Sequence, residues 1–161
     1  MRLTKILFLG LFMLSTSGAL VAQGPKPVAT SGKAAIRTID IIGNDEMQYS
    51  VKTITASPGE QIRIRMISRG VLPKVAMAHN VVVLQPGTDI TRFLNAGAPH
   101  RDTDFVAPQF KQQVIAQTPM AGPGETVQVV FTVPAKPGRY PYICTFAGHY
   151  MAGMQGVLIV K

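Results

Sequence analysis

Short runs of alternating apolar and polar residues dominate the chain beyond its first thirty-odd positions. The clearest run, residues 61–66, reads QIRIRM, which places its apolar side chains on one face of an extended strand and its arginines on the other. Turn-forming Gly, Pro, Asn and Asp residues separate this run from other extended runs at 36–42, 47–51, 79–84, 111–118, 127–133, 139–144 and 156–161. The pattern predicts an all-β fold, a Greek-key β-sandwich or barrel of about seven to eight strands.

One segment, residues 89–98, departs from this alternation. Its apolar residues Ile90, Phe93 and Leu94 follow helical spacing, and Asp89 precedes them as a residue that can cap a helix N-terminus. We therefore expect one short helical insertion in the β-fold.

The first 22 residues are organised like a secretory signal peptide. Arg2 and Lys5 precede an apolar run, 6–14, which is too short to span a bilayer, and small residues allow cleavage after Ala19 or Ala22. A retained membrane anchor is the alternative. The predicted organisation is a signal peptide at 1–22, a flexible linker at 23–34 and one domain at 35–161. We therefore expect a periplasmic or secreted protein.

The chain of 161 residues contains a single cysteine and three histidines. One cysteine excludes an intrachain disulfide framework and any zinc site built from several thiolates. Exported proteins usually enter an oxidising compartment, where a free thiol must be buried or bound. Cys144, His149 and Met154 follow the spacing C-x4-H-x4-M between two predicted strands, so one loop can direct all three side chains toward one point. Two histidines, a cysteine and a weak axial methionine are the ligands of a blue copper site.

The second histidine of such a site must come from elsewhere in the chain. His79 is the best candidate because it begins an apolar strand, whereas His100 lies in a polar loop where we expect a solvated side chain. Met151 competes with Met154 as axial ligand, but it follows His149 too closely, which favours Met154.

The sequence CTFAGH at 144–149, with Ala78-His79-Asn80 upstream, resembles the copper loops of the azurin and auracyanin branch of the cupredoxins. The resemblance extends to residues 41–49, 72–74 and 156–158, and the gap between His149 and Met154 is more similar to auracyanin. It implies one bound copper ion with three equatorial ligands, a weak axial ligand and a distant backbone carbonyl, and an asparagine that hydrogen-bonds to the cysteine loop. The resemblance assigns His79, Cys144 and His149 as the equatorial ligands and Met154 as the axial ligand. It assigns the distant carbonyl to Ala78 and the hydrogen-bonding role to Asn80.

The same resemblance implies an apolar docking patch around His149, made of Met77, Ala147 and Met151. Removal of residues 1–22 would take away Arg2 and Lys5 and lower the formal net charge from +8 to +6. This positive charge favours redox partners with acidic docking faces, through electrostatic steering. The scattered basic residues give no nucleic-acid signature. We expect a monomer whose contact with membranes is at most peripheral.

These features predict a blue copper protein that carries single electrons between redox partners and is not an enzyme. Copper storage or delivery is the alternative, since the same ligands would serve it. A copper oxidase or reductase is the less favoured reading, because it needs a second, open copper site and only His100 remains to build one.

Overall fold

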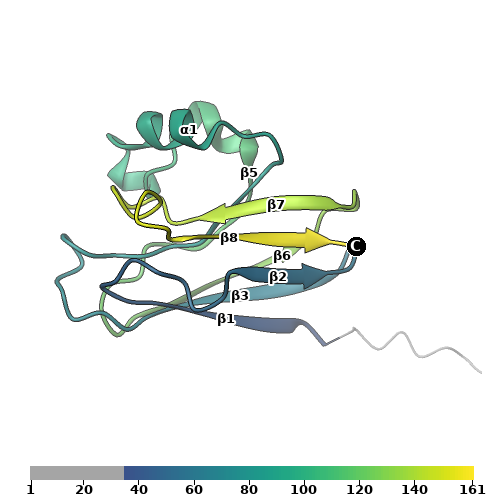
Figure 1. Cartoon of the computed structure of the whole chain (residues 1–161), viewed down its shortest axis with the longest axis horizontal. Coiled ribbons are helices and arrows are strands. Elements are labelled where there is room, and N and C mark those ends of the chain that lie inside the picture. Colours follow the sequence, from purple (N-terminus) through teal and green to yellow (C-terminus); the bar gives the residue numbers. More distant parts are fainter. Residues whose placement is uncertain (1–34) are drawn as a thin grey trace, which may run out of the picture. The chain divides into compact units, whose positions relative to one another are not determined.

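Residues 35–161 are described by a computed structural model, so the predicted signal peptide (1–22) and linker (23–34) lie outside the described residues. Eight strands, one α-helix and two 3₁₀ helices make up this part of the chain (Figure 1). In chain order they are β1 (Arg37–Gly43), β2 (Thr53–Ala56), β3 (Gln61–Ser68), β4 (Val82–Leu84), α1 (Ile90–Gly97), η1 (Arg101–Thr103), η2 (Pro108–Gln113), β5 (Val114–Gln117), β6 (Thr126–Thr132), β7 (Gly138–Ile143) and β8 (Gln155–Val160). In the described part, no helix is long and apolar enough to cross a lipid bilayer.

The strands form two sheets, one of three strands in the order β1-β3-β6 and one of five in the order β2-β8-β7-β4-β5. The pairs β1–β3 and β2–β8 are parallel, and the other pairs are antiparallel. The predicted all-β sandwich of seven to eight strands with one short helix is therefore confirmed.

Strand β3 shows how alternation produces the core. Ile62, Ile64 and Met66 are fully buried against residues of the other sheet, as the alternation predicts. On the opposite face Arg65 pairs with Asp40 of β1, its register partner, and both side chains stay partly exposed. An exposed ion pair of this kind contributes little free energy, so burial of the apolar face dominates.

Helix α1 covers the outer face of the five-stranded sheet. Asp89 caps it by accepting a hydrogen bond from the backbone N–H of Arg92 (3.0 Å). Phe93 packs into a second apolar cluster with Val82 and Leu84 of β4. Because β4 is buried on both faces, its sequence is a continuous apolar run and does not alternate.

Three predicted strands differ from the observed elements. Residues 47–51 form no strand, because Met47 adopts a left-handed conformation (φ +56°) and only Tyr49 pairs, in an isolated bridge to Gly43. The first three residues of 111–118 belong to η2, which Pro108 initiates. His79 pairs only in an isolated bridge to Ala121, so the strand that follows it begins later, at Val82.

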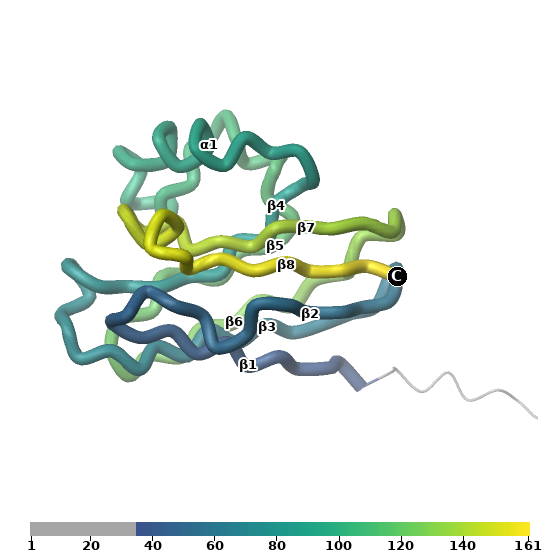
Figure 2. The backbone as a smooth tube through the Cα atoms, in the orientation of Figure 1, coloured from purple at the N-terminus to yellow at the C-terminus, as the bar shows by residue number. Residues whose placement is uncertain are grey.

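Two connections meet at one end of the sandwich, opposite the C-terminus (Figure 2). One is the loop that precedes β4, and the other is the loop between β7 and β8, drawn at the yellow end of the colour scale. These loops carry the residues that are predicted from the sequence to be metal ligands.

We expect Ile64→Ala to lower the free energy of unfolding by roughly 2–5 kcal/mol, because it leaves a cavity in the core beside β1 and β6. Urea denaturation measures the loss. Val130→Ala on β6 is the matched control, since Val130 is 41% exposed, and it should cost less than about 1 kcal/mol. Equal losses in the two variants would contradict the placement of the core.

Candidate metal centre

The candidate ligands lie in loops beside neighbouring strands of the five-stranded sheet. Cys144 directly follows β7, Met154 directly precedes β8, and His149 lies in the turn between them. The backbone N–H of Cys144 donates to the carbonyl of Met154 (3.1 Å), which closes the loop at its base. Two backbone hydrogen bonds to Ala121 (2.9 and 2.8 Å) fix the position of His79 upstream of β4.

His79, Cys144 and His149 converge on one point although 65 residues separate the first two. Their ligand atoms all lie within 4.8 Å of one another, and all three residues are buried. The Nδ1 atoms of the two histidines are 3.2 Å apart, and the sulfur of Cys144 lies 3.4 Å from Nδ1 of His149. His100 lies outside this cluster, immediately before η1.

The two weaker candidate ligands lie next to the same cluster. The carbonyl oxygen of Ala78 is 3.9 Å from the sulfur of Cys144. Met154 is fully buried, and its methyl group and the ring of His79 both approach Gly43. A Cβ atom at Gly43 would lie 2.5 Å from Met66 Cε, 2.7 Å from Met154 Cε and 3.3 Å from His79 Cδ2, so a larger residue there would displace these side chains.

Burial governs the protonation of the three donors. It raises the pKa of the Cys144 thiol to about 12, although backbone N–H groups of Asn80 and Phe146 oppose this shift. Burial, with the nearby His79, lowers the pKa of His149 to about 4. Burial also lowers the pKa of His79, against the opposing effect of Asp45. Both imidazoles are therefore neutral at pH 7 and offer lone pairs.

This donor set fits copper. Two neutral imidazole nitrogens face each other at 3.2 Å, and a sulfur lies beside them. A cation bound between these buried donors would accept their lone pairs. Thiolate suits Cu(I), and imidazole accepts both Cu(I) and Cu(II).

Asn80 ties the histidine segment to the cysteine loop. Its side-chain oxygen accepts a hydrogen bond from the backbone N–H of Thr145 (2.9 Å), and its NH₂ group donates to the Thr145 hydroxyl (2.8 Å). The carbonyl of Asn80 accepts a hydrogen bond from Tyr49. All three residues are buried, so these bonds hold the two ligand-bearing segments in one register.

A strained turn supports the cysteine loop from the other side, and the sequence patterns gave no sign of it. Asp104 and Phe105 both have positive φ angles (+53° and +61°), which is unusual for residues other than glycine. The Thr145 hydroxyl donates to the carbonyl of Asp104 (2.7 Å), and the Phe105 ring packs edge-on against Phe146. A tendency of Asp to adopt the left-handed conformation is the only local signal for this turn.

The three residues of the predicted docking patch differ in exposure. Met151 is 81% exposed and Ala147 is exposed, whereas Met77 is half-buried. His149 itself is only 2% exposed, because the half-buried ring of Phe146 lies over it with ring centres 4.7 Å apart.

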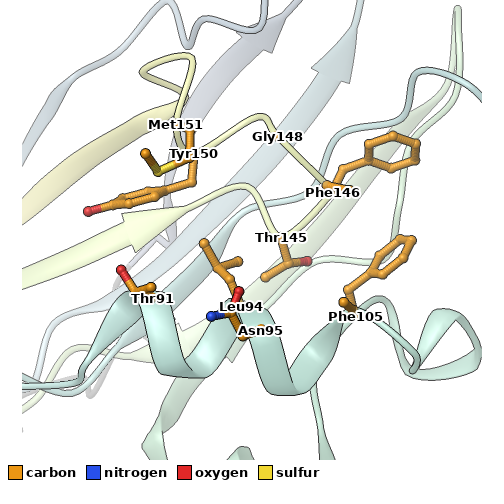
Figure 3. A pocket seen from close by; sticks show the side chains of 11 residues that line it. Thr91, Leu94, Asn95, Phe105, Thr145, Phe146, Gly148, Tyr150 and Met151 are labelled. Atoms are coloured by element: carbon orange, nitrogen blue, oxygen red, sulfur yellow. The ribbon is translucent and has the colours of Figure 1, made fainter.

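A pocket of about 200 Å³ opens beside this patch, between α1 and the loop after β7 (Figure 3). Leu94 and Asn95 line it from the helix, and Phe146, Tyr150 and Met151 line it from the loop. The apolar surface of the loop after β7, which carries the candidate ligands, therefore continues onto α1.

Comparisons with known proteins agree with this site. The family model described as "Copper binding proteins, plastocyanin/azurin family" matches residues 37–161. Auracyanin-B of Chloroflexus aurantiacus is 34% identical over 117 residues, 72% of this chain and 48% of auracyanin-B. Azurin of Pseudomonas aeruginosa is 38% identical over 132 residues, 80% of this chain and 87% of that azurin. The structure of auracyanin A, a "blue" copper protein of Chloroflexus aurantiacus, has a TM-score of 0.69 and 32% identity, covering 77% of this chain and 98% of that one.

The chain therefore belongs to the plastocyanin/azurin family of copper-binding proteins, the cupredoxins. Its resemblance to azurins and auracyanins, predicted from the copper-loop motifs, is confirmed. The expected metal of the family is copper, and the His, Cys and His cluster supplies suitable donors. The chain spans about half the length of auracyanin-B.

We expect Asn80→Ala to destabilise the metal-free protein by about 1–3 kcal/mol, because the buried N–H of Thr145 loses its acceptor. Copper affinity should fall roughly 10- to 100-fold, as the two ligand segments lose their connection. Denaturation curves and competition with a copper chelator measure the two effects. Asn95→Ala, on the exposed face of α1, is the matched control and should change neither. The same results for both variants would contradict the role of Asn80.

Copper uptake at pH 7 should release about one proton per chain, because the Cys144 thiol, with a pKa of about 12, must lose its proton to bind metal. The neutral histidines release none. A falling pH favours the protonated thiol, so the apparent affinity should fall about tenfold per pH unit. Calorimetry in two buffers of different ionisation enthalpy measures the proton. Uptake without proton release would contradict thiolate ligation.

Proposed function

We propose that this chain is an exported mononuclear type 1 copper protein that carries single electrons between redox partners. The observation that carries the proposal is the buried cluster of His79, Cys144 and His149, whose donor atoms lie within 4.8 Å of one another. One such cluster in a small β-sandwich suits a carrier, since substrate chemistry at a metal requires an open coordination position.

In this proposal His79, Cys144 and His149 are the equatorial ligands. Met154 is the weak axial ligand, and the carbonyl of Ala78 is a distant fifth group. Bound copper would supply a one-electron Cu(I)/Cu(II) couple. The chain supplies a set of donors that partly suits both Cu(I) and Cu(II) and fully suits neither.

The structure around the donors favours fast electron exchange. Hydrogen bonds from Asn80 and Thr145 and backbone pairing of His79 fix the donors before metal arrives. A pre-organised, buried site changes little when its charge changes, so little reorganisation opposes electron transfer.

Partners would approach the loop after β7. Met151 and Ala147 are exposed there, and Phe146 lies between this surface and the ring of His149. We propose this apolar surface as the docking patch, with Met77 at its edge. The positive net charge of the chain would steer it toward partners with acidic faces.

Export is part of the proposal and rests on the sequence of residues 1–22, with the basic start, apolar run and small residues of a signal peptide. Secretion would place the Cys144 thiol in an oxidising compartment. Metal ligation and complete burial would both protect it there.

An absorption spectrum recorded during copper titration tests this function. We expect an intense visible band from charge transfer between thiolate and Cu(II), which saturates at one copper per chain. Cys144→Ser should abolish the band, because a hydroxyl is not a soft, ionised donor. A colourless Cu(II) complex, or a band that survives in Cys144→Ser, would overturn the proposal.

Two rates then separate an electron carrier from a copper-delivery protein. A carrier should exchange electrons between its oxidised and reduced forms rapidly and transfer copper to a chelator slowly. The opposite pair of rates would favour copper delivery.

A further inference from the structure

The connection between β1 and β2 lies against the loop that carries Met154 (Figure 2). The side-chain NH₂ of Gln48 donates to the carbonyl of Ala152 (2.6 Å). The ammonium of Lys52 donates to the carbonyl of Gly153 (2.9 Å) and to the side-chain oxygen of Gln48 (2.6 Å). We call the side chains of Gln48 and Lys52 the brace.

The brace acts on the two peptide groups that immediately precede Met154. Gly153 has a φ angle of +99°, and a Cβ atom there would lie 3.1 Å from the Gln48 amide nitrogen. Backbone hydrogen bonds from Ala152 to Gly148, and from Gly153 to Tyr150, wind this stretch into a tight turn. The carbonyls of such a turn point outward, and here the brace satisfies them.

The segment that bears the brace is anchored independently of the metal loop. The carbonyl of Lys52 accepts a hydrogen bond from Val157 of β8 (2.9 Å), and the backbone N–H of Ser50 donates to Ile42 of β1 (2.9 Å). Between the two brace residues, Tyr49 turns inward and donates to the carbonyl of Asn80. The brace therefore connects a fixed part of both sheets to the turn before Met154.

We infer that Gln48 and Lys52 are positioning residues for Met154 and thereby set the reduction potential of the bound copper. The inference rests on the proposed function, in which Met154 is the weak axial ligand. The axial ligand tunes the potential of a blue copper site, so a constraint on the backbone of that ligand sets how closely its sulfur approaches. The brace touches no donor atom and acts only through the turn.

Gln48→Leu is the principal variant, because it removes the bond to Ala152 without changing the charge of the protein. Its matched control is Gln128→Leu, on the exposed face of β6. Lys52→Met removes the bonds to Gly153 and to the side chain of Gln48. Lys136→Met, in the turn between β6 and β7, controls for the lost charge.

We expect the reduction potential of Gln48→Leu to rise, because a looser turn lets the thioether withdraw and withdrawal of a donor favours Cu(I). The relative intensities of the visible bands should change with it, and Gln128→Leu should match the parent protein in both. In a Met154→Leu background the Gln48→Leu substitution should have no further effect on the potential, since its effect is transmitted through the thioether.

Hydrogen exchange of the metal-free protein gives a second test that requires no copper. The amides of Gly153 and Met154 donate to Tyr150 and His149, and in Gln48→Leu they should exchange roughly fivefold faster. Exchange in the core strand β3 should not change, which would show that the variant is folded.

The results distinguish a failure of this inference from a failure of the proposed function. If the parent protein shows no thiolate–copper band, the proposed function fails and the inference fails with it. If the band is present, but the potential and the exchange rates of Gln48→Leu equal those of Gln128→Leu, the inference alone is overturned. A shift that persists in the Met154→Leu background overturns it too.

Discussion

The side chain of Asn80 joins two stretches of chain that are 65 residues apart in sequence. One stretch carries His79 and the other begins at Cys144, so the register between these two donors depends on this contact. Tyr49 supports Asn80 from within the core, and Asp104 supports Thr145 from the surface side. Because Asn80, Tyr49 and Thr145 are buried, the hydrogen bonds among them face little competition from water, and losing one would leave a polar group unsatisfied.

Burial also explains why the donors suit a metal. Burial makes the thiol, whose pKa is raised to about 12, a poor acid, and it makes the two imidazoles, whose pKa values are lowered, poor bases. A bound cation reverses the balance at the thiol, because it favours the thiolate that burial alone disfavours. Before the metal binds, the thiol and the two imidazoles are therefore all uncharged.

Local sequence patterns were sufficient for most of the fold and for the cluster. Alternation over 61–66 predicted which face of β3 is buried, and the spacing of Cys144, His149 and Met154 predicted that one loop carries them. The patterns failed at 47–51, where alternation indicated a strand but Met47 leaves the extended conformation. They were silent on Asp104, Gln48 and Lys52, because hydrogen bonds across more than 40 residues leave no periodic trace.

The dependence on distant partners has a consequence for the order of events in time. His79 and Cys144 meet only after β4 has paired with β7, and that pairing must close a long loop. Contacts between residues far apart in sequence form late and slowly, so the site should assemble near the end of folding. An ion that binds after this pairing would meet a folded chain and would not guide its folding. Copper supply and chain maturation can therefore proceed as separate events, and a pool of folded, metal-free protein can wait for its metal.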